Sequence, residues 1–297
     1  MKNKSFTLIE LLVVIVIVGV LAGVIMVTVS SSVSNATLAR AKAFSSNVQN
    51  SMLLNLVSEW TFDNIPDTYL NTAIPTTSNY IADEWGVNDG TVYGDPDLKN
   101  GNNCVFGKCI SFDGSGDYID CGNNYSLNIT DEVTISMWAK SQEVNSNVRW
   151  LIGKGLYREA FLLGFYNEKL MFHGSSDGSS WIYSVNGGTV QNNTWYYIVL
   201  TLDKINGVKL YKNGSLSGDD SNVYKLKSTQ NNDLYIGRRG YSDEIHLGSI
   251  DDVRIYDAAL SSAQIKQNYI AGLNSMLANG NISEEEFNQR INNLATK

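Results

Sequence analysis

Glu10 is an acidic residue at the start of a long apolar run, where a charged side chain needs a partner. Lys2 and Lys4 precede it, and the 19 residues Leu11–Val29 carry no charge. As a helix this run would extend roughly 29 Å, close to the thickness of the hydrocarbon core of a bilayer. An unpaired carboxylate in such a segment costs about 3 kcal/mol, so we expect a cation to neutralise it.

Residues Lys4–Glu10 and the apolar run resemble the N-terminal signal of bacterial type IV pilins and pseudopilins. In that family a prepilin peptidase cuts before the phenylalanine, and the new amino group is methylated. The resemblance places the cut between Ser5 and Phe6 and makes Glu10 the fifth mature residue. It implies that Glu10 pairs with the amino group of Phe6 on a neighbouring subunit, since a buried charge is tolerated when paired. Ser5 departs from the family, which usually has glycine there.

The element that must position this acid is a predicted helix over residues 6–56. The two lysines keep the leader, residues 1–5, in the cytoplasm, and residues 6–29 are the predicted transmembrane part. Beyond it, apolar residues recur at three-, four- and seven-residue spacings, which is typical of a helix with one apolar face. They are Leu38, Ala41, Val48, Met52 and Leu56. The alternative is a plain signal anchor that never assembles into a filament, but such an anchor would leave Glu10 without a function.

Composition limits the classes to which the rest of the chain can belong. The chain has 297 residues, 43% of them apolar, which is enough for a substantial core. Its formal net charge is −8. This acidic balance disfavours electrostatic binding of nucleic acid, and we expect no nucleic-acid partner.

After Trp60 the sequence changes to short aromatic-rich or alternating runs separated by Gly, Asn and Asp. This pattern predicts about ten to thirteen strands in an antiparallel jelly-roll β-sandwich over residues 57–260. Residues 64–105 are polar and are expected to form long loops. The clearest predicted strands are Val133–Ala139, Phe161–Tyr166, Leu170–Phe172, Trp181–Val185, Trp195–Asp203, Val208–Tyr211, Leu234–Gly237 and Ile250–Tyr256.

Residues 261–297 are predicted to be a helical tail. Helical spacing of apolar residues covers Ser262–Ala278, and Ser283–Glu286 reads as a capping box that opens a second helix. The fold class is therefore mainly β, with a long N-terminal helix and a short helical C-terminus.

Eight short motifs follow one another in the predicted sandwich. They are Trp60–Asp63, Asp83–Gly90, Ser111–Gly114, Asp117–Tyr118, Val133–Trp138, Trp195–Tyr197, Leu210–Gly214 and Gly248–Tyr256. In this order they resemble the laminin G-like, concanavalin A-like jelly roll of bacterial surface proteins. That family implies sugar or protein binding, often with a structural calcium ion.

The resemblance implies calcium near Asp63, Asp83, Asn88 and Asp251. Calcium takes several oxygen ligands, and loops rich in Asp and Asn supply them. The same residue types also make turns and loop hydrogen bonds, so this second interpretation stays open.

Aromatic residues beside polar loops are the predicted ligand contacts, because ring faces pack against the C–H surfaces of sugars. The predicted contacts are Trp150, Trp181, Arg239 and Tyr241. Trp138 and Trp195 lie in apolar strand patterns and are predicted to be core. No strand carries alternating acids, and His173 and His246 are far apart, so we expect no catalytic activity. A membrane-tethered glycan hydrolase is the enzymatic alternative.

The three cysteines allow more than one pairing. Cys104 and Cys109 flank a four-residue segment that a disulfide could close outside the cytoplasm. If Phe112 and Tyr118 face each other across a turn, Cys109 lies opposite Cys121 instead. We favour Cys104–Cys109, which leaves Cys121 free or paired between chains.

Together these patterns predict a pilin-like subunit with a lectin-like head outside the cell. A head of over two hundred residues is bulky for a major repeated subunit, so a minor or tip pilin is favoured. A major pilin and a secretion-system pseudopilin are the alternatives. The expected partners are other filament subunits, prepilin peptidase, the assembly machinery, the cytoplasmic membrane and a glycan or surface protein. The protein would cross the cytoplasmic membrane once before it joins a surface filament.

Overall fold

A computed structural model describes most of the chain after the predicted membrane segment. The described residues are 52–74, 80–145, 147–155, 158, 160–228, 231–240 and 244–295. The predictions for Ser5, Phe6 and Glu10, and nearly all of the helix predicted over residues 6–56, lie outside these ranges. Within them, no helix has the length and apolar character needed to cross a membrane.

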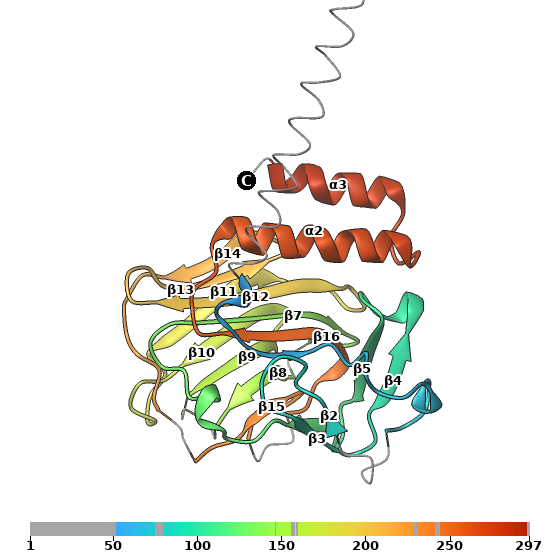
Figure 1. The fold of residues 1–297 in the computed structure, drawn as a ribbon. Coiled ribbons are helices and arrows are strands. Elements are labelled where there is room, and N and C mark those ends of the chain that lie inside the picture. Colours follow the sequence, from blue (N-terminus) through green and yellow to red (C-terminus); the bar gives the residue numbers. More distant parts are fainter. Residues whose placement is uncertain are drawn as a thin grey trace, which may run out of the picture. The chain divides into compact units, whose positions relative to one another are not determined.

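The described residues form two antiparallel sheets that pack face to face, so the predicted sandwich is confirmed (Figure 1). Sheet A contains, in spatial order, β14 (Ser215–Asp220), β13 (Gly207–Lys212), β12 (Tyr196–Asp203), β7 (Val133–Ser141), β16 (Leu247–Tyr256), β5 (Lys108–Asp113) and β4 (Asp97–Asn100), with β1 (Leu56–Trp60) paired to β16. Sheet B contains β11 (Tyr183–Thr189), β10 (Lys169–Gly174), β9 (Phe161–Tyr166), β8 (Arg149–Lys154), β15 (Leu234–Ile236), β6 (Tyr118–Asp120), β3 (Gly90–Tyr93) and β2 (Tyr80–Ile81). Short 3-10 helices occupy Asp67–Tyr69, Gly101–Asn103 and Tyr125–Leu127.

The alternation of apolar residues along the strands places the core between the sheets. In β9, for example, Leu163 and Phe165 are fully or almost fully buried in the core, and Phe172 of β10 joins them. Trp138 and Trp195 are 0% and 6% exposed, which confirms that they are buried. Burial of this many large side chains supplies the main driving force for folding.

Most of the predicted strands begin or end one to four residues away from the observed ones. Two predictions about which elements form are wrong. Residues 64–105 are not only loops, because β2, β3 and β4 lie there. These strands are two to four residues long, and β4 turns only one apolar side chain, Leu98, into the core. The predicted helix also does not reach Leu56, because Leu56 begins β1 and pairs with Tyr256.

The two helices of the predicted tail are confirmed as α2 (Ser262–Ala278) and α3 (Glu284–Ala295), which lie together on one side of the sandwich (Figure 1). Ser261 and Gln264 form a capping box at α2, and Ser283 Oγ accepts the Glu286 N–H at 3.1 Å at the start of α3.

Helix α2 covers the outer face of sheet A through aromatic contacts. Tyr269 stacks on Trp138 with ring centroids 5.7 Å apart. Gly272 lies against the same indole, where an added Cβ would come within 2.1 Å of the ring. Glycine is therefore required at this position for α2 to approach the sheet.

The favoured disulfide, Cys104–Cys109, is present, and Cys121 is a buried free thiol. Main-chain groups of the six-residue disulfide loop bond to β16 and to the end of α2. Asp251 accepts the N–H groups of Val105 and Phe106 at 2.8 and 2.9 Å. Ser275 and Asn279 donate to the Val105 carbonyl at 2.6 and 3.2 Å. The loop therefore connects the helical tail to the sandwich.

Candidate functional site

The outer face of sheet B carries a group of side chains that the sequence analysis partly identified. Trp150 on β8 pairs with Gly164 on β9, and His173 on β10 pairs with Leu162 on β9. Trp150 and His173 therefore point away from the core, opposite to Leu163 and its inward neighbours. Gly164 permits this arrangement, because an added Cβ would lie 2.7 Å from the Trp150 Cα.

Three aromatic rings are in contact on this face. The His173 ring packs edge-on against Trp150 at 5.8 Å and lies 5.4 Å from Trp181. Trp181 is placed by a turn in which Asp177 Oδ1 accepts the N–H groups of Ser179 and Ser180 at 2.8 and 3.0 Å. Those bonds lower the pKa of Asp177, so the turn holds an ionised carboxylate.

Two charged residues complete the group. Glu244 Oε2 accepts a hydrogen bond from Trp150 Nε1 at 2.8 Å and pairs with Arg239 Nε at 2.9 Å. Burial lowers the pKa of His173, so its imidazole is neutral at pH 7. We call Trp150, His173, Trp181, Arg239 and Glu244 the aromatic cluster.

The accessible part of the aromatic cluster differs from the prediction. Trp150 is only 4% exposed, so its ring cannot stack on a ligand and instead supports His173 and Glu244. Trp181, His173 and Arg239 are half-buried, so part of each side chain is accessible to solvent. Ring faces next to a few fixed polar groups suit the recognition of a sugar.

The structure thus brings together Trp150, Trp181 and Arg239, while Tyr241 lies outside the described residues. His173 was named above only in the argument against catalysis, and Glu244 was not identified from the sequence. The signal for His173 was its alternation with Phe172 on one strand, which turns one side chain inward and the next outward. The sequence held no comparable signal for Glu244.

Of the four residues for which calcium was expected, Asp83 and Asn88 belong to a hydrogen-bonded turn. Asp83 Oδ1 accepts N–H groups from Glu59, Trp85 and Gly86 at 2.9 to 3.2 Å. Its Oδ2 accepts the Asn88 N–H at 3.0 Å. A carboxylate that faces four N–H donors organises the backbone and is poorly placed to bind a cation.

Asp63 and Asp251 instead contact the disulfide loop. Asp63 Oδ1 accepts the Lys108 N–H at 2.7 Å. Asp251 is fully buried, and its Oδ1 has no hydrogen-bond partner within the described ranges. Burial raises the pKa of the Asp251 carboxyl well above its usual range. Asp251 Oδ1 is therefore buried, and no hydrogen bond from a described residue offsets the cost of removing it from water.

A different acidic group was not predicted. Asp95, Asp113 and Asp117 have carboxylate oxygens within 4.8 Å of one another, beside a cavity of about 410 Å³. Asp117 Oδ1 and Oδ2 accept the N–H groups of Asp95 and Asp113 at 2.8 and 2.9 Å. Desolvation raises the pKa of Asp117 to about 6, against the effect of these bonds. Asp117 therefore shapes the turn, and the group alone does not identify a ligand.

Two family models match the chain. A model described as the concanavalin A-like lectin/glucanases superfamily matches residues 113–266, slightly more than half of the chain. A prokaryotic N-terminal methylation motif, the signal of type IV pilins, matches residues 1–26. No curated protein matches the chain.

Solved structures with the same fold include binding domains of toxins and one domain of an arabinanase. The binding domain of Paraclostridial Mosquitocidal Protein 1 superposes with a TM-score of 0.58 at 16% identity, over 75% of this chain and 53% of that one. The botulinum neurotoxin serotype C1 binding domain gives 0.56 at 14% identity, over 74% and 53%. The chain thus spans about half the length of these toxin domains.

A third structure is domain 4 of AbnA, a GH43 extracellular arabinanase from Geobacillus stearothermophilus, in complex with arabinotriose. It superposes with a TM-score of 0.52 at 20% identity, over 71% of this chain and 97% of that one. At these identities the likeness establishes the fold alone.

Proposed function

This chain belongs to the concanavalin A-like lectin/glucanase superfamily, and we propose that its folded domain is a non-catalytic, lectin-like head that binds a glycan through the aromatic cluster. The observation that carries the proposal is the half-buried Trp181 ring held beside His173 and the Arg239–Glu244 pair. The arabinotriose bound to domain 4 of AbnA supports a sugar as the first ligand to test.

The proposal that the head is not an enzyme is supported by the hydrogen bonds of one group of three neighbouring acids among the described residues. Hydrolysis with retention needs two carboxyl groups about 5 Å apart that are free to act as acid and nucleophile. Among the described residues Asp95, Asp113 and Asp117 lie close enough, but both oxygens of Asp117 accept main-chain N–H groups. Binding without turnover is the function these contacts favour.

The test is a glycan array followed by calorimetry with linear arabino-oligosaccharides. Trp181→Ala is expected to weaken binding by about tenfold or more, because loss of a stacking ring removes about 1.5 kcal/mol or more. Trp85→Ala is the matched control, since Trp85 is 48% exposed but lies outside the aromatic cluster. If no glycan binds, or if both variants bind like the wild type, the proposal is wrong.

The N-terminal signal extends the proposal to the whole protein. The methylation motif implies processing by prepilin peptidase, membrane insertion and assembly into a pilus. We propose that residues 6–29 cross the cytoplasmic membrane once, and that the protein is then a minor or tip subunit whose head mediates adhesion to a glycan or a surface protein. The size of the head favours this role over that of a major pilin or a pseudopilin.

We still propose that the head binds calcium, and the buried carboxyl group of Asp251 is now the ligand that we expect. A cation would satisfy its Oδ1, which otherwise carries an uncompensated desolvation cost. EDTA is expected to lower the thermal midpoint of the protein by about 4 °C or more, and Asp251→Asn to remove that response. EDTA already saturated with calcium is the control. Identical melting curves with and without free EDTA would contradict the prediction.

A further inference from the structure

Three large apolar side chains are exposed on neighbouring segments of the head. Trp85 and Val87 lie in the loop between β2 and β3 and are 48% and 72% exposed. Tyr125 begins a 3-10 helix and is 77% exposed. Ser126 Oγ donates to Asn88 Oδ1 at 3.0 Å, so the loop and the 3-10 helix lie side by side. We call Trp85, Val87 and Tyr125 the apolar tip.

The side chains of the apolar tip contribute little to the core, yet hydrogen bonds fix the backbone that carries them. The buried Asp83 carboxylate accepts the N–H groups of Trp85, Gly86 and Asn88 at 2.9 to 3.2 Å. Trp60 Nε1 donates to the Asn88 carbonyl at 3.0 Å and ties the loop to β1. Apolar side chains that are held in water on a fixed backbone and lie close together mark an interaction site.

The same hydrogen bonds indicate which kind of partner fits. The apolar part of a bilayer offers no hydrogen bonds, so a segment that meets it must satisfy its own N–H groups. In the loop, the Glu84 N–H donates to the Glu59 carbonyl at 2.8 Å, and Asp83 accepts the three N–H groups described above. In the 3-10 helix, Asn124 Oδ1 accepts the Ser126 N–H at 3.1 Å. These N–H groups have partners that do not depend on water.

The residue types of the apolar tip also favour a lipid surface. Tryptophan and tyrosine concentrate at the level of the lipid headgroups, where the ring is apolar and its polar end stays wet. The two segments, residues 83–90 and 122–127, contain no lysine or arginine, and their charged residues are Asp83, Glu84 and Asp89. Anionic lipids attract basic segments. A zwitterionic lipid surface therefore fits the apolar tip better than an anionic one.

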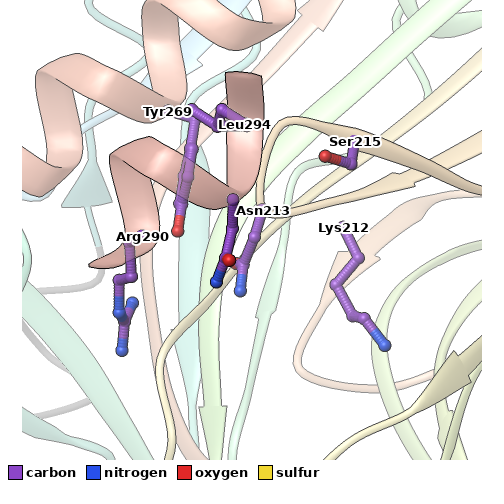
Figure 2. Close-up of a pocket in the computed structure, with 7 residues that line it drawn as sticks. Lys212, Asn213, Ser215, Tyr269, Arg290 and Leu294 are labelled. Carbon is purple, nitrogen blue, oxygen red and sulfur yellow. The ribbon is translucent and has the colours of Figure 1, made fainter. Parts of the chain in front are cut away.

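A recess beside the helical tail shows how the apolar tip differs from a small-molecule site (Figure 2). That recess has about 170 Å³, and its lining includes Arg290 and Tyr269. Arg290 pairs with Glu286 at 2.6 Å and Tyr269 stacks on Trp138, so these side chains serve the packing of the tail. The apolar tip lines neither this recess nor the cavity of about 410 Å³. Because small ligands bind in concave sites, a protruding tip suits an extended surface instead.

We propose that the apolar tip is a membrane-docking site that inserts Trp85, Val87 and Tyr125 into the interface of a zwitterionic lipid bilayer. It shares no residue with the aromatic cluster, so it does not depend on the glycan binding proposed above. Three side chains give a weak contact, and we expect an association weaker than the about 10⁴ M⁻¹ of a single myristoyl chain. The contact would strengthen binding at the aromatic cluster when both ligands belong to one cell surface.

The test measures quenching of tryptophan fluorescence by vesicles of brominated phosphatidylcholine. It uses residues 52–297, which form a compact unit with its own core and lack the predicted membrane segment. Of the six tryptophans, all but Trp85 and Trp181 are buried. We expect half-maximal quenching at about 1 mM lipid, and the same quenching in Trp181→Ala. Vesicles that also contain phosphatidylserine are expected to bind no more tightly.

Val87→Asp is expected to weaken vesicle binding by about tenfold or more, because a carboxylate resists transfer from water into the interface. This variant keeps Trp85 as the reporter. Ile205→Asp is the matched control, since Ile205 is an exposed apolar residue in the turn between β12 and β13. It adds the same charge and is expected to bind like the wild type. Melting curves show whether both variants are folded.

Three results would overturn the proposal. They are no quenching of the wild type at up to about ten times the expected lipid concentration, equal binding of folded Val87→Asp and Ile205→Asp, and binding that requires phosphatidylserine. Loss of the quenching in Trp181→Ala would also overturn it, because the lipid contact would then lie at the aromatic cluster.

Discussion

Replacement of Glu10 by Gln is expected to remove the protein from surface filaments while leaving it in the membrane. The substitution keeps the size of the side chain but removes its charge, so it can no longer neutralise the amino group of Phe6 on a neighbouring subunit. An unpaired ammonium group in an apolar environment costs several kcal/mol, about enough to shift assembly by three orders of magnitude or more. The measurement is the amount of protein in sheared filaments relative to the membrane fraction.

Glu84→Gln is the matched control for this experiment, because Glu84 is an exposed acid of the head. It is expected to assemble like the wild type. Should Glu10→Gln also assemble at wild-type levels, the N-terminal segment would serve only as a membrane anchor.

Removal of the disulfide through Cys104→Ser and Cys109→Ser is expected to lower the free energy of unfolding of the head substantially. Loss of a crosslink that closes a loop of six residues costs about 2 kcal/mol through the unfolded chain. The loop also positions the main-chain groups bonded by Asp251, Ser275 and Asn279, each of which contributes about 1 kcal/mol. We therefore expect a lower thermal midpoint and faster amide exchange in α2 and α3.

Hydrogen exchange can distinguish local loosening of the helical tail from a general loss of stability. The account predicts that protection falls first in α2 and α3, before it falls in β7 or β12. Cys121→Ala is the control, since Cys121 is buried but forms no disulfide. Uniform loss of protection across both sheets and the tail would contradict a specific role of the loop in holding the helices.

Much of the sandwich could be predicted because its long strands are apolar and aromatic runs bounded by Gly, Asn and Asp. Phe161–Tyr166 matches β9 residue for residue, and the expected helix over Ser262–Ala278 matches α2. Both have several large apolar residues at the period of their element. β2 and β4 lack this signal, because strands of two and four residues contain too few inward-facing side chains to set a period.

The candidate site was harder to predict because it depends on register and on loops. Trp150 and Trp181 were identified from residue type, but the sequence does not reveal that Trp150 is covered by its neighbours. His173 joins them because strand pairing sets it beside Trp150. Glu244 approaches from a segment 94 residues away, a contact that no local pattern encodes.

The acidic residues could not be assigned a role from the sequence for a similar reason. Asp63, Asp83, Asn88 and Asp251 share a composition typical of calcium loops, but most of their oxygens accept main-chain N–H groups. Asp and Asn serve turns and cations with the same atoms. Only the direction of neighbouring donors distinguishes the two uses, and that direction is a property of the fold.

The most direct test of the central claim is mass spectrometry of the protein recovered from purified surface filaments. The account predicts a chain that begins at a methylated Phe6, without Met1–Ser5, present in far fewer copies than the main filament subunit. A chain that retains Lys2–Ser5, or filaments that contain none of this protein, would contradict the claim that it is a pilin-like subunit carrying a binding head.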